Sequence, residues 1–262
     1  MPEAAIPIPS ATILLIRDGQ QGLEVFMVVR HHQIDFASGA LVFPGGKVDA
    51  QDSEPAWQNF IDADLNDPLT LLKIAAIRES FEECGVLLAR DSTLQIDTLV
   101  GAARVTALAD ERDKLNAKKI QFIELVRTSQ LTLASKELVH FAHWITPQMM
   151  PKRFDTHFFI AASPPDHDLQ HDGYESVDSV WIRPQQALDE AAAGDRTIIF
   201  PTLRNLEKLS QYTRVEPALA QIAKETIVPV TPWTEDREEG KFLCIPKDAG
   251  YENFEQLLPS KS

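Results

Sequence analysis

The sequence is poor in cysteine, in long apolar runs and in basic residues, and each shortage excludes a class of protein. Two cysteines, Cys84 and Cys244, are too few for a disulfide framework, so we expect reduced thiols. No stretch approaches the roughly 18 consecutive apolar residues that span a bilayer, so we expect no membrane segment. The first ten residues also lack the basic and apolar regions of a secretory signal, and we therefore expect a soluble, cytoplasmic protein.

The shortage of basic residues limits the partners that the protein can bind. Lys and Arg number 25 against 39 Asp and Glu, which gives a formal net charge of −14. Such a chain would repel a nucleic-acid backbone, so we expect no nucleic-acid partner. A small polyanionic substrate stays open, because metal ions and a few local cations can reverse the sign of the potential inside a pocket. None of these features indicates an oligomeric state.

Short apolar runs and stretches of helical period follow one another along the chain. The runs predict a hairpin of residues 12–17 and 23–30, a short strand at 40–43, and later strands at 138–145, 156–162 and 177–182. The helical period predicts helices at 68–84, 107–128, 184–193 and 201–212. Together they predict an α+β (mixed α/β) fold, with a mixed β-sheet packed between helices.

We expect residues 1–262 to form one domain. Around its core we expect an insertion at about 50–68, a helical segment at about 107–128 and a C-terminal helical extension from about 201.

One face of the helix predicted at 68–84 is acidic. Glu79, Glu82 and Glu83 stand at i, i+3 and i+4, so their carboxylates share that face. Like charges at this spacing repel, and Mg²⁺ or Mn²⁺, which prefer oxygen ligands, would offset the repulsion. Arg78 can orient one carboxylate by a bidentate contact. The alternative is a solvated surface, which is what charge runs usually form.

The residues around the acidic run favour a metal site over a solvated surface. The run follows a strand that ends in Phe-Pro-Gly-Gly at 43–46, and residues 78–86 read Arg-Glu-Ser-Phe-Glu-Glu-Cys-Gly-Val. This segment resembles the second half of the Nudix signature, G-x5-E-x7-R-E-U-x-E-E-x-G-U, where U is a bulky aliphatic residue. It matches at every fixed position, with Ser80 replacing the first aliphatic.

The first half of the signature is stretched. Gly46 matches its first glycine, and Asp52 stands where its first glutamate is expected. Seven residues after Asp52 would put the arginine at position 60, and it stands at 78, so eighteen residues are inserted. The position of Asp52 relative to the helix is therefore open.

A split signature preceded by Phe-Ala-Ser-Gly-Ala-Leu-Val-Phe-Pro-Gly-Gly at 36–46 resembles the Nudix branch of the peroxisomal coenzyme A diphosphatase and its bacterial relatives. The runs at 144–147 and 151–159 are also similar to that branch, although His157 stands where an arginine is expected. The resemblance implies a Nudix fold and metal-dependent hydrolysis of a nucleoside diphosphate linked to another group, with coenzyme A or acyl-CoA as first expectation. ADP-ribose, NADH or a nucleotide sugar, or a binding module without catalysis, stay open as alternatives.

The resemblance also implies roles for single residues. Glu82 and Glu83 would be ligands of Mg²⁺ or Mn²⁺, and Glu79 a ligand or the catalytic base. Gly45 and Gly46 would let the backbone turn tightly beside the metal. Outside the signature, we expect Arg30 and Arg153 to bind substrate phosphates; the alternative for Arg30 is an exposed hairpin end. Glu175 and Asp178 are the possible bases, and the alternative for each is a solvated turn. The expected partner is a small nucleotide-derived molecule.

Overall fold

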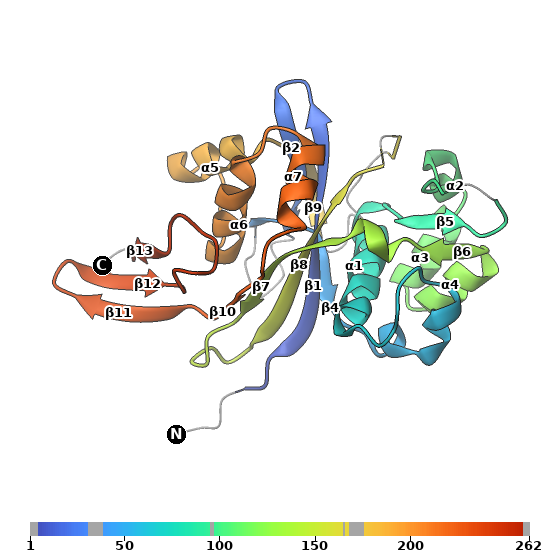
Figure 1. Ribbon diagram of the computed structural model, residues 1–262, viewed down its shortest axis with the longest axis horizontal. Coiled ribbons are helices and arrows are strands. Elements are labelled where there is room, and N and C mark those ends of the chain that lie inside the picture. The colour runs from blue at the N-terminus through green and yellow to red at the C-terminus, as the bar shows by residue number, and fades with distance from the viewer. Residues whose placement is uncertain (1–4, 31–38, 95–96, 165, 168–175, 259–262) are drawn as a thin grey trace.

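A mixed eight-stranded β-sheet lies between two groups of helices in the computed structural model of the chain (Figure 1). The structure describes residues 5–30, 39–94, 97–164, 166–167 and 176–258, and only the backbone of residues 30, 176 and 177. The helices are α1 (Pro68–Cys84), α2 (Ala102–Thr106), α3 (Ala109–Asn116), α4 (Phe122–Thr128), α5 (Pro184–Ala193), α6 (Phe200–Ser210) and α7 (Val215–Ile222). In Figure 1 the first four stand on one side of the sheet and the last three on the other.

The eight strands of this sheet are β1 (Ile8–Gly19), β2 (Gly22–Arg30), β3 (Leu41–Val42), β4 (Gly45–Lys47), β7 (Val139–Ile145), β8 (Phe154–Ala162), β9 (Ser176–Ile182) and β10 (Pro229–Val230). Their order is β10-β7-β8-β1-β2-β3, and in addition β4 pairs with β1 and β9 with β2. Strand β1 runs parallel to β8 and antiparallel to β2 and β4. Two smaller sheets join β5 (Ala89–Asp91) to β6 (Leu131–Leu133), and β11 (Trp233–Arg237) to β12 (Gly240–Cys244) and β13 (Glu255–Leu257).

Both faces of the central sheet are buried, and β1 shows why. Ala11, Ile13 and Leu15 point into the core that contains α1. Leu14 and Ile16 point the opposite way, into the core that contains α5, α6 and α7. Because successive side chains of a strand alternate between faces, a continuous apolar run such as residues 13–16 of β1 needs helices on both sides.

Helix α1 begins and ends where the sequence predicts. The Asp67 carboxylate accepts a hydrogen bond from the backbone N–H of Leu69 at 2.9 Å, and Pro68 takes the first helical position. Gly85 ends the helix with φ 69°, a left-handed conformation that favours glycine. Ile74, Ile77 and Phe81 recur at spacings of three and four residues along α1, and all three are fully buried.

The structure differs from the prediction in two segments. Residues 107–128 form two helices, α3 and α4, because the chain turns between them through Lys118 at φ 55°. After α7 the predicted helical extension gives way to strands, and Gly240, at φ 132°, begins β12 directly after the turn at residues 238–239. The insertion at about 50–68 contains two 3₁₀ turns, Ala50–Ser53 and Pro55–Asn59, anchored by the fully buried Trp57.

None of the helices in the described ranges is long and apolar enough to cross a membrane. The cytoplasmic location stays a prediction.

A buried hydrogen-bonded chain ties the C-terminal segment to the sheet. Trp144 Nε1–H donates to the Tyr251 hydroxyl at 2.8 Å, which in turn donates to Asn205 Oδ1 at 2.7 Å. Burial raises the pKa of Tyr251 well above its ordinary value, so the hydroxyl keeps its proton. Tyr251→Phe would leave a buried indole N–H and a buried amide oxygen without this partner. We expect the free energy of unfolding, measured by urea denaturation, to fall by about 1–3 kcal/mol.

Tyr212→Phe is the matched control for this prediction. The Tyr212 hydroxyl is partly exposed and donates to Glu225 at 3.3 Å, so water can replace that bond and the loss should stay within about 0.5 kcal/mol. Equal losses in the two variants would show that the buried hydrogen bonds of Tyr251 stabilise the fold no more than the partly exposed bond of Tyr212.

Candidate active site

Arg78 is the centre of a carboxylate cluster on α1, and only 4% of its surface is exposed. Its Nε and Nη2 donate to the two oxygens of Asp52, each at 2.9 Å. Its Nη1 donates to Glu79 Oε1 at 2.8 Å and to Glu82 Oε2 at 3.0 Å. Nη2 also donates to the backbone carbonyl of Lys47 at 2.9 Å. One guanidinium therefore binds three carboxylates and a backbone carbonyl of strand β4.

The structure fixes the position of Asp52, which the sequence left open. Asp52 is 1% exposed, and its Oδ2 also accepts the backbone N–H of Asp49 at 2.8 Å. The insertion lengthens the path from Asp52 to α1 without separating Asp52 from Arg78, because the two residues meet in a bidentate ion pair.

The strand that carries Gly45 and Gly46 passes directly against the carboxylates of α1. The backbone N–H of Gly45 donates to Glu83 Oε2 at 3.0 Å, and Glu83 is 8% exposed. A Cβ at Gly46 would overlap the carboxylate of Glu79, so any side chain there would displace it. The glycine pair, which lies in strand β4 and not in the tight turn predicted for it, thus permits the close approach of β4 and α1.

Burial and charge shift the proton affinities in the cluster. Burial raises the pKa of Glu82 to about 7; Arg78 opposes the rise and Glu79 adds to it. Burial would lower the pKa of Arg78, but its hydrogen bonds to Asp52 and the charges of Glu79, Asp52 and Glu82 hold that pKa above its ordinary value. Arg78 pairs with three carboxylates, those of Asp52, Glu79 and Glu82, and the carboxylate of Glu83, on the same helix as Arg78, accepts the Gly45 N–H.

This donor set fits Mg²⁺ or Mn²⁺, because its carboxylates offer only oxygen ligands, which these ions prefer. Glu79 and Glu82 turn toward Arg78, and Glu83 turns toward the backbone of Gly45. Among the described residues, the three-residue group with ligand atoms within 4.8 Å of one another is a different one, His143, Asp155 and His157. The joint metal ligation by the three glutamates stays a prediction.

Helix α3 supports α1 from outside the predicted motif. Arg112 Nε and Nη2 donate to the backbone carbonyl of Glu82 at 3.1 and 2.9 Å, and Asn116 Nδ2 donates to it at 3.3 Å. These donors satisfy one of the carbonyls that the end of a helix leaves without an intrahelical partner. The sequence gives no signal for them, because they lie 30 and 34 residues from Glu82.

Of the predicted residues outside the signature, Arg153 and Asp178 have side chains that the structure describes, and both have partners other than the carboxylates of α1. Arg153 is 8% exposed, and its guanidinium donates to the carbonyls of Thr146 and Ala5, which favours a structural role over a phosphate contact. Asp178 shares a sheet face with Val180 and Ile182, which pack against the core of α5–α7, so it lies on the face opposite α1. The side chain of Arg30, and all of Glu175, lie outside the described residues.

Known proteins match most of this architecture. A family model of the NUDT19 Nudix domain matches residues 67–209, more than half of the 262 residues. Putative nudix hydrolase 7 of Caenorhabditis elegans is 28% identical, over 71% of this chain and 56% of its own length. The acyl-coenzyme A diphosphatase NUDT19 is 23% identical in Xenopus laevis (91% of this chain, 74% of that protein) and 24% identical in Homo sapiens (73% and 62%). This chain thus spans about half to three quarters of these relatives.

Among solved structures, the crystal structure of a NUDIX hydrolase from Alicyclobacillus acidocaldarius superposes with a TM-score of 0.66 at 26% identity. The match covers 82% of this chain and 96% of that one. It confirms the predicted fold class, a Nudix fold with a mixed sheet packed between helices.

Proposed function

This chain belongs to the Nudix hydrolases, in the branch of the NUDT19 Nudix domain, and from that membership we propose that it hydrolyses the diphosphate linkage of coenzyme A or an acyl-CoA. The observation that carries the proposal is the buried carboxylate cluster around Arg78, packed against Gly45 and Gly46 of β4. The Xenopus and human relatives act, by name, on acyl-coenzyme A, which supports this substrate class over other dinucleotides.

Glu79, Glu82 and Glu83 would hold Mg²⁺ or Mn²⁺ in this proposal. A bound divalent ion of this kind neutralises diphosphate oxygens and lowers the pKa of water. Arg78 acts as a positioning residue, since it keeps Glu79 and Glu82 on one side of α1. Asp52 in turn fixes Arg78, and the Gly45 N–H fixes Glu83. A binding module without catalysis would not need this set of contacts, so their presence supports an enzyme.

A substrate panel tests the proposed function. Coenzyme A, an acyl-CoA, ADP-ribose, NADH and a nucleotide sugar are assayed side by side with Mg²⁺ and with Mn²⁺, and again with a chelator. We expect kcat/KM for coenzyme A or the acyl-CoA to exceed the others on the order of tenfold or more, and the chelator to abolish turnover. A preference for another dinucleotide would overturn the substrate, and hydrolysis of none would overturn the enzyme.

Gly46→Ala tests the close approach of β4 to α1. The new methyl group would overlap the Glu79 carboxylate and push it out of position. A displacement of about 1 Å beside reacting groups can cost on the order of a hundredfold, so we expect kcat to fall about 10- to 100-fold. Steady-state assays measure the effect, and circular dichroism checks the fold.

Gly194→Ala is the control, because nothing lies within 4 Å of a Cβ there; its φ of 83° adds backbone strain that Gly46→Ala does not have, so the control tests strain without a clash. Its turnover should match that of the unmodified chain. A Gly46→Ala variant with unchanged turnover would show that Glu79 does not need its present position.

A further inference from the structure

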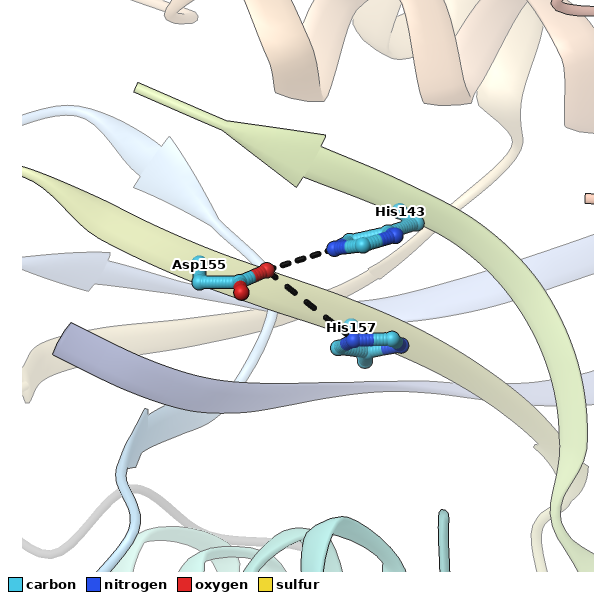
Figure 2. Close-up of side chains that lie close together, drawn as sticks. All are labelled: His143, Asp155 and His157. Carbon is cyan, nitrogen blue, oxygen red and sulfur yellow. Dashed lines mark hydrogen bonds and ion pairs between the residues drawn. The ribbon is translucent and has the colours of Figure 1, made fainter. Parts of the chain in front are cut away.

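A second cluster of metal-ligating side chains lies outside the carboxylate cluster. His143 comes from β7, and Asp155 and His157 come from the neighbouring strand β8 (Figure 2). His143 and His157 stand directly opposite each other in the antiparallel pair, and Asp155 precedes His157 by two residues, so all three point to the same face of the sheet. Their ligand atoms lie within 4.8 Å of one another.

The two imidazoles converge on one carboxylate oxygen. His143 Nε2 lies 2.5 Å from Asp155 Oδ1, and His157 Nε2 lies 3.9 Å from the same atom. The two rings are stacked, with centroids 3.9 Å apart and an interplanar angle of 21°. The histidine side chains are 15% and 16% exposed and that of Asp155 is 37% exposed, so the cluster is sheltered but open to an ion from solvent.

His140 sets the tautomer of His157. His157 Nδ1 lies 3.0 Å from His140 Nε2. His140 also forms a hydrogen bond with the backbone of Ala142, and this bond favours the protonated ring. His140 is therefore the donor to Ala142. A neutral His140 that gives its single proton to Ala142 must accept from His157 with Nε2. The His157 proton then sits on Nδ1, and its Nε2 lone pair faces Asp155. Metal-binding histidines are commonly oriented in this way by a partner of their other nitrogen.

We propose that His143, Asp155 and His157 bind a divalent transition-metal ion of the zinc class, with two imidazole nitrogens and one carboxylate oxygen as ligands. Imidazole suits Zn²⁺, Co²⁺ and Ni²⁺, whereas Mg²⁺ prefers sites made only of oxygen. The site is thus distinct in chemistry from the carboxylate cluster of α1, and it does not rest on the proposed hydrolysis.

The two sites share one face of the sheet. His157 pairs with Ala11 of β1, and Ala11 pairs with Gly46, which lies against Glu79. His157 and Gly46 are therefore two strand spacings apart, about 10 Å. Each site can be removed by substitution without touching the residues of the other.

Zn²⁺ titration of the full chain tests the proposal. The protein is stripped with a chelator, dialysed into excess Mg²⁺ to occupy oxygen-only sites, and titrated with Zn²⁺ in a calorimeter. We expect one equivalent of tight binding. His143→Ala and the isosteric Asp155→Asn should each weaken it at least about 100-fold, and His140→Gln, which removes an outer partner, about 10- to 100-fold.

His167→Gln serves as the matched histidine control, because its Nε2 bonds the carbonyl of Val100 away from this cluster, and it should bind Zn²⁺ as the unmodified chain does. Glu83→Gln should also keep Zn²⁺ binding while losing turnover, which separates failure of this proposal from failure of the proposed function. Absence of Zn²⁺ binding, or binding that Asp155→Asn leaves unchanged in a folded protein, would overturn the site and leave His143 and Asp155 as a plain ion pair.

Discussion

Glu83→Gln is expected to lower kcat by roughly 10²- to 10³-fold while the fold stays intact. Glutamine has the size of glutamate and keeps a side-chain oxygen, so the Gly45 N–H still finds its acceptor. What the substitution removes is the negative charge that would hold a divalent ion against the diphosphate. Steady-state hydrolysis of coenzyme A at saturating Mg²⁺, with circular dichroism and a thermal melt, measures both parts of the expectation.

The control for this variant is Glu124→Gln on α4, where the side chain is exposed and lies outside the carboxylate cluster. Its turnover and its melting temperature should be those of the unmodified chain. Full activity of a folded Glu83→Gln variant would show that the carboxylates of α1 do not carry the reaction.

Local signals in the sequence were enough to predict α1 and most of the central sheet. Asp67, Pro68 and Gly85 mark the ends of α1 through side-chain capping, a fixed φ and a left-handed conformation, and each of these acts within a few residues. Strands β1 and β2 follow from two apolar runs joined by a glycine-containing turn. In contrast, the break between α3 and α4 depends on the left-handed conformation of Lys118, which side-chain periodicity does not reveal.

The acidic face of α1 could also be predicted, but its partners could not. The contact of Arg78 with Asp52 spans 26 residues and depends on how the insertion folds back. The cluster of His143, Asp155 and His157 depends on the register between β7 and β8, which includes an irregularity between His140 and Ala142. Hydrophobic period places side chains on a face, whereas contacts between strands follow from a register that one extra residue shifts.

Arg78→Met is expected to be the most destabilising substitution at the site. The buried guanidinium balances the Asp52 carboxylate, whose side chain has no exposed surface, and those of Glu79 and Glu82. Removing one partner of a buried ion pair leaves an uncompensated charge, which costs about 3–5 kcal/mol. Urea denaturation in the presence of a chelator measures the loss. Arg17→Met is the control: its ion pair with Glu24 is exposed, so the loss should stay below about 1 kcal/mol.

The pH dependence of that loss has a definite sign. In the folded protein the pKa of Glu82 is raised to about 7, and Arg78 opposes the rise, so the variant should raise it further. A carboxyl group whose folded pKa exceeds its unfolded pKa favours the folded state below the unfolded value and loses that contribution as pH rises through the folded pKa. The difference in unfolding free energy between Arg78→Met and the unmodified chain should therefore be smaller at pH 5 than at pH 8.

A double-variant cycle with Asp52→Asn decides whether Arg78 stabilises the fold through charge balance. If charge balance is the cause, neutralising Asp52 removes much of what Arg78 must compensate, and the double variant loses less stability than the sum of the two single losses. Contacting residues of this kind show interaction energies of about 0.5–3 kcal/mol. Additive losses would mean that Arg78 stabilises the fold through packing of its alkyl chain. Contacts other than those with the guanidinium would then keep the carboxylates of α1 in position.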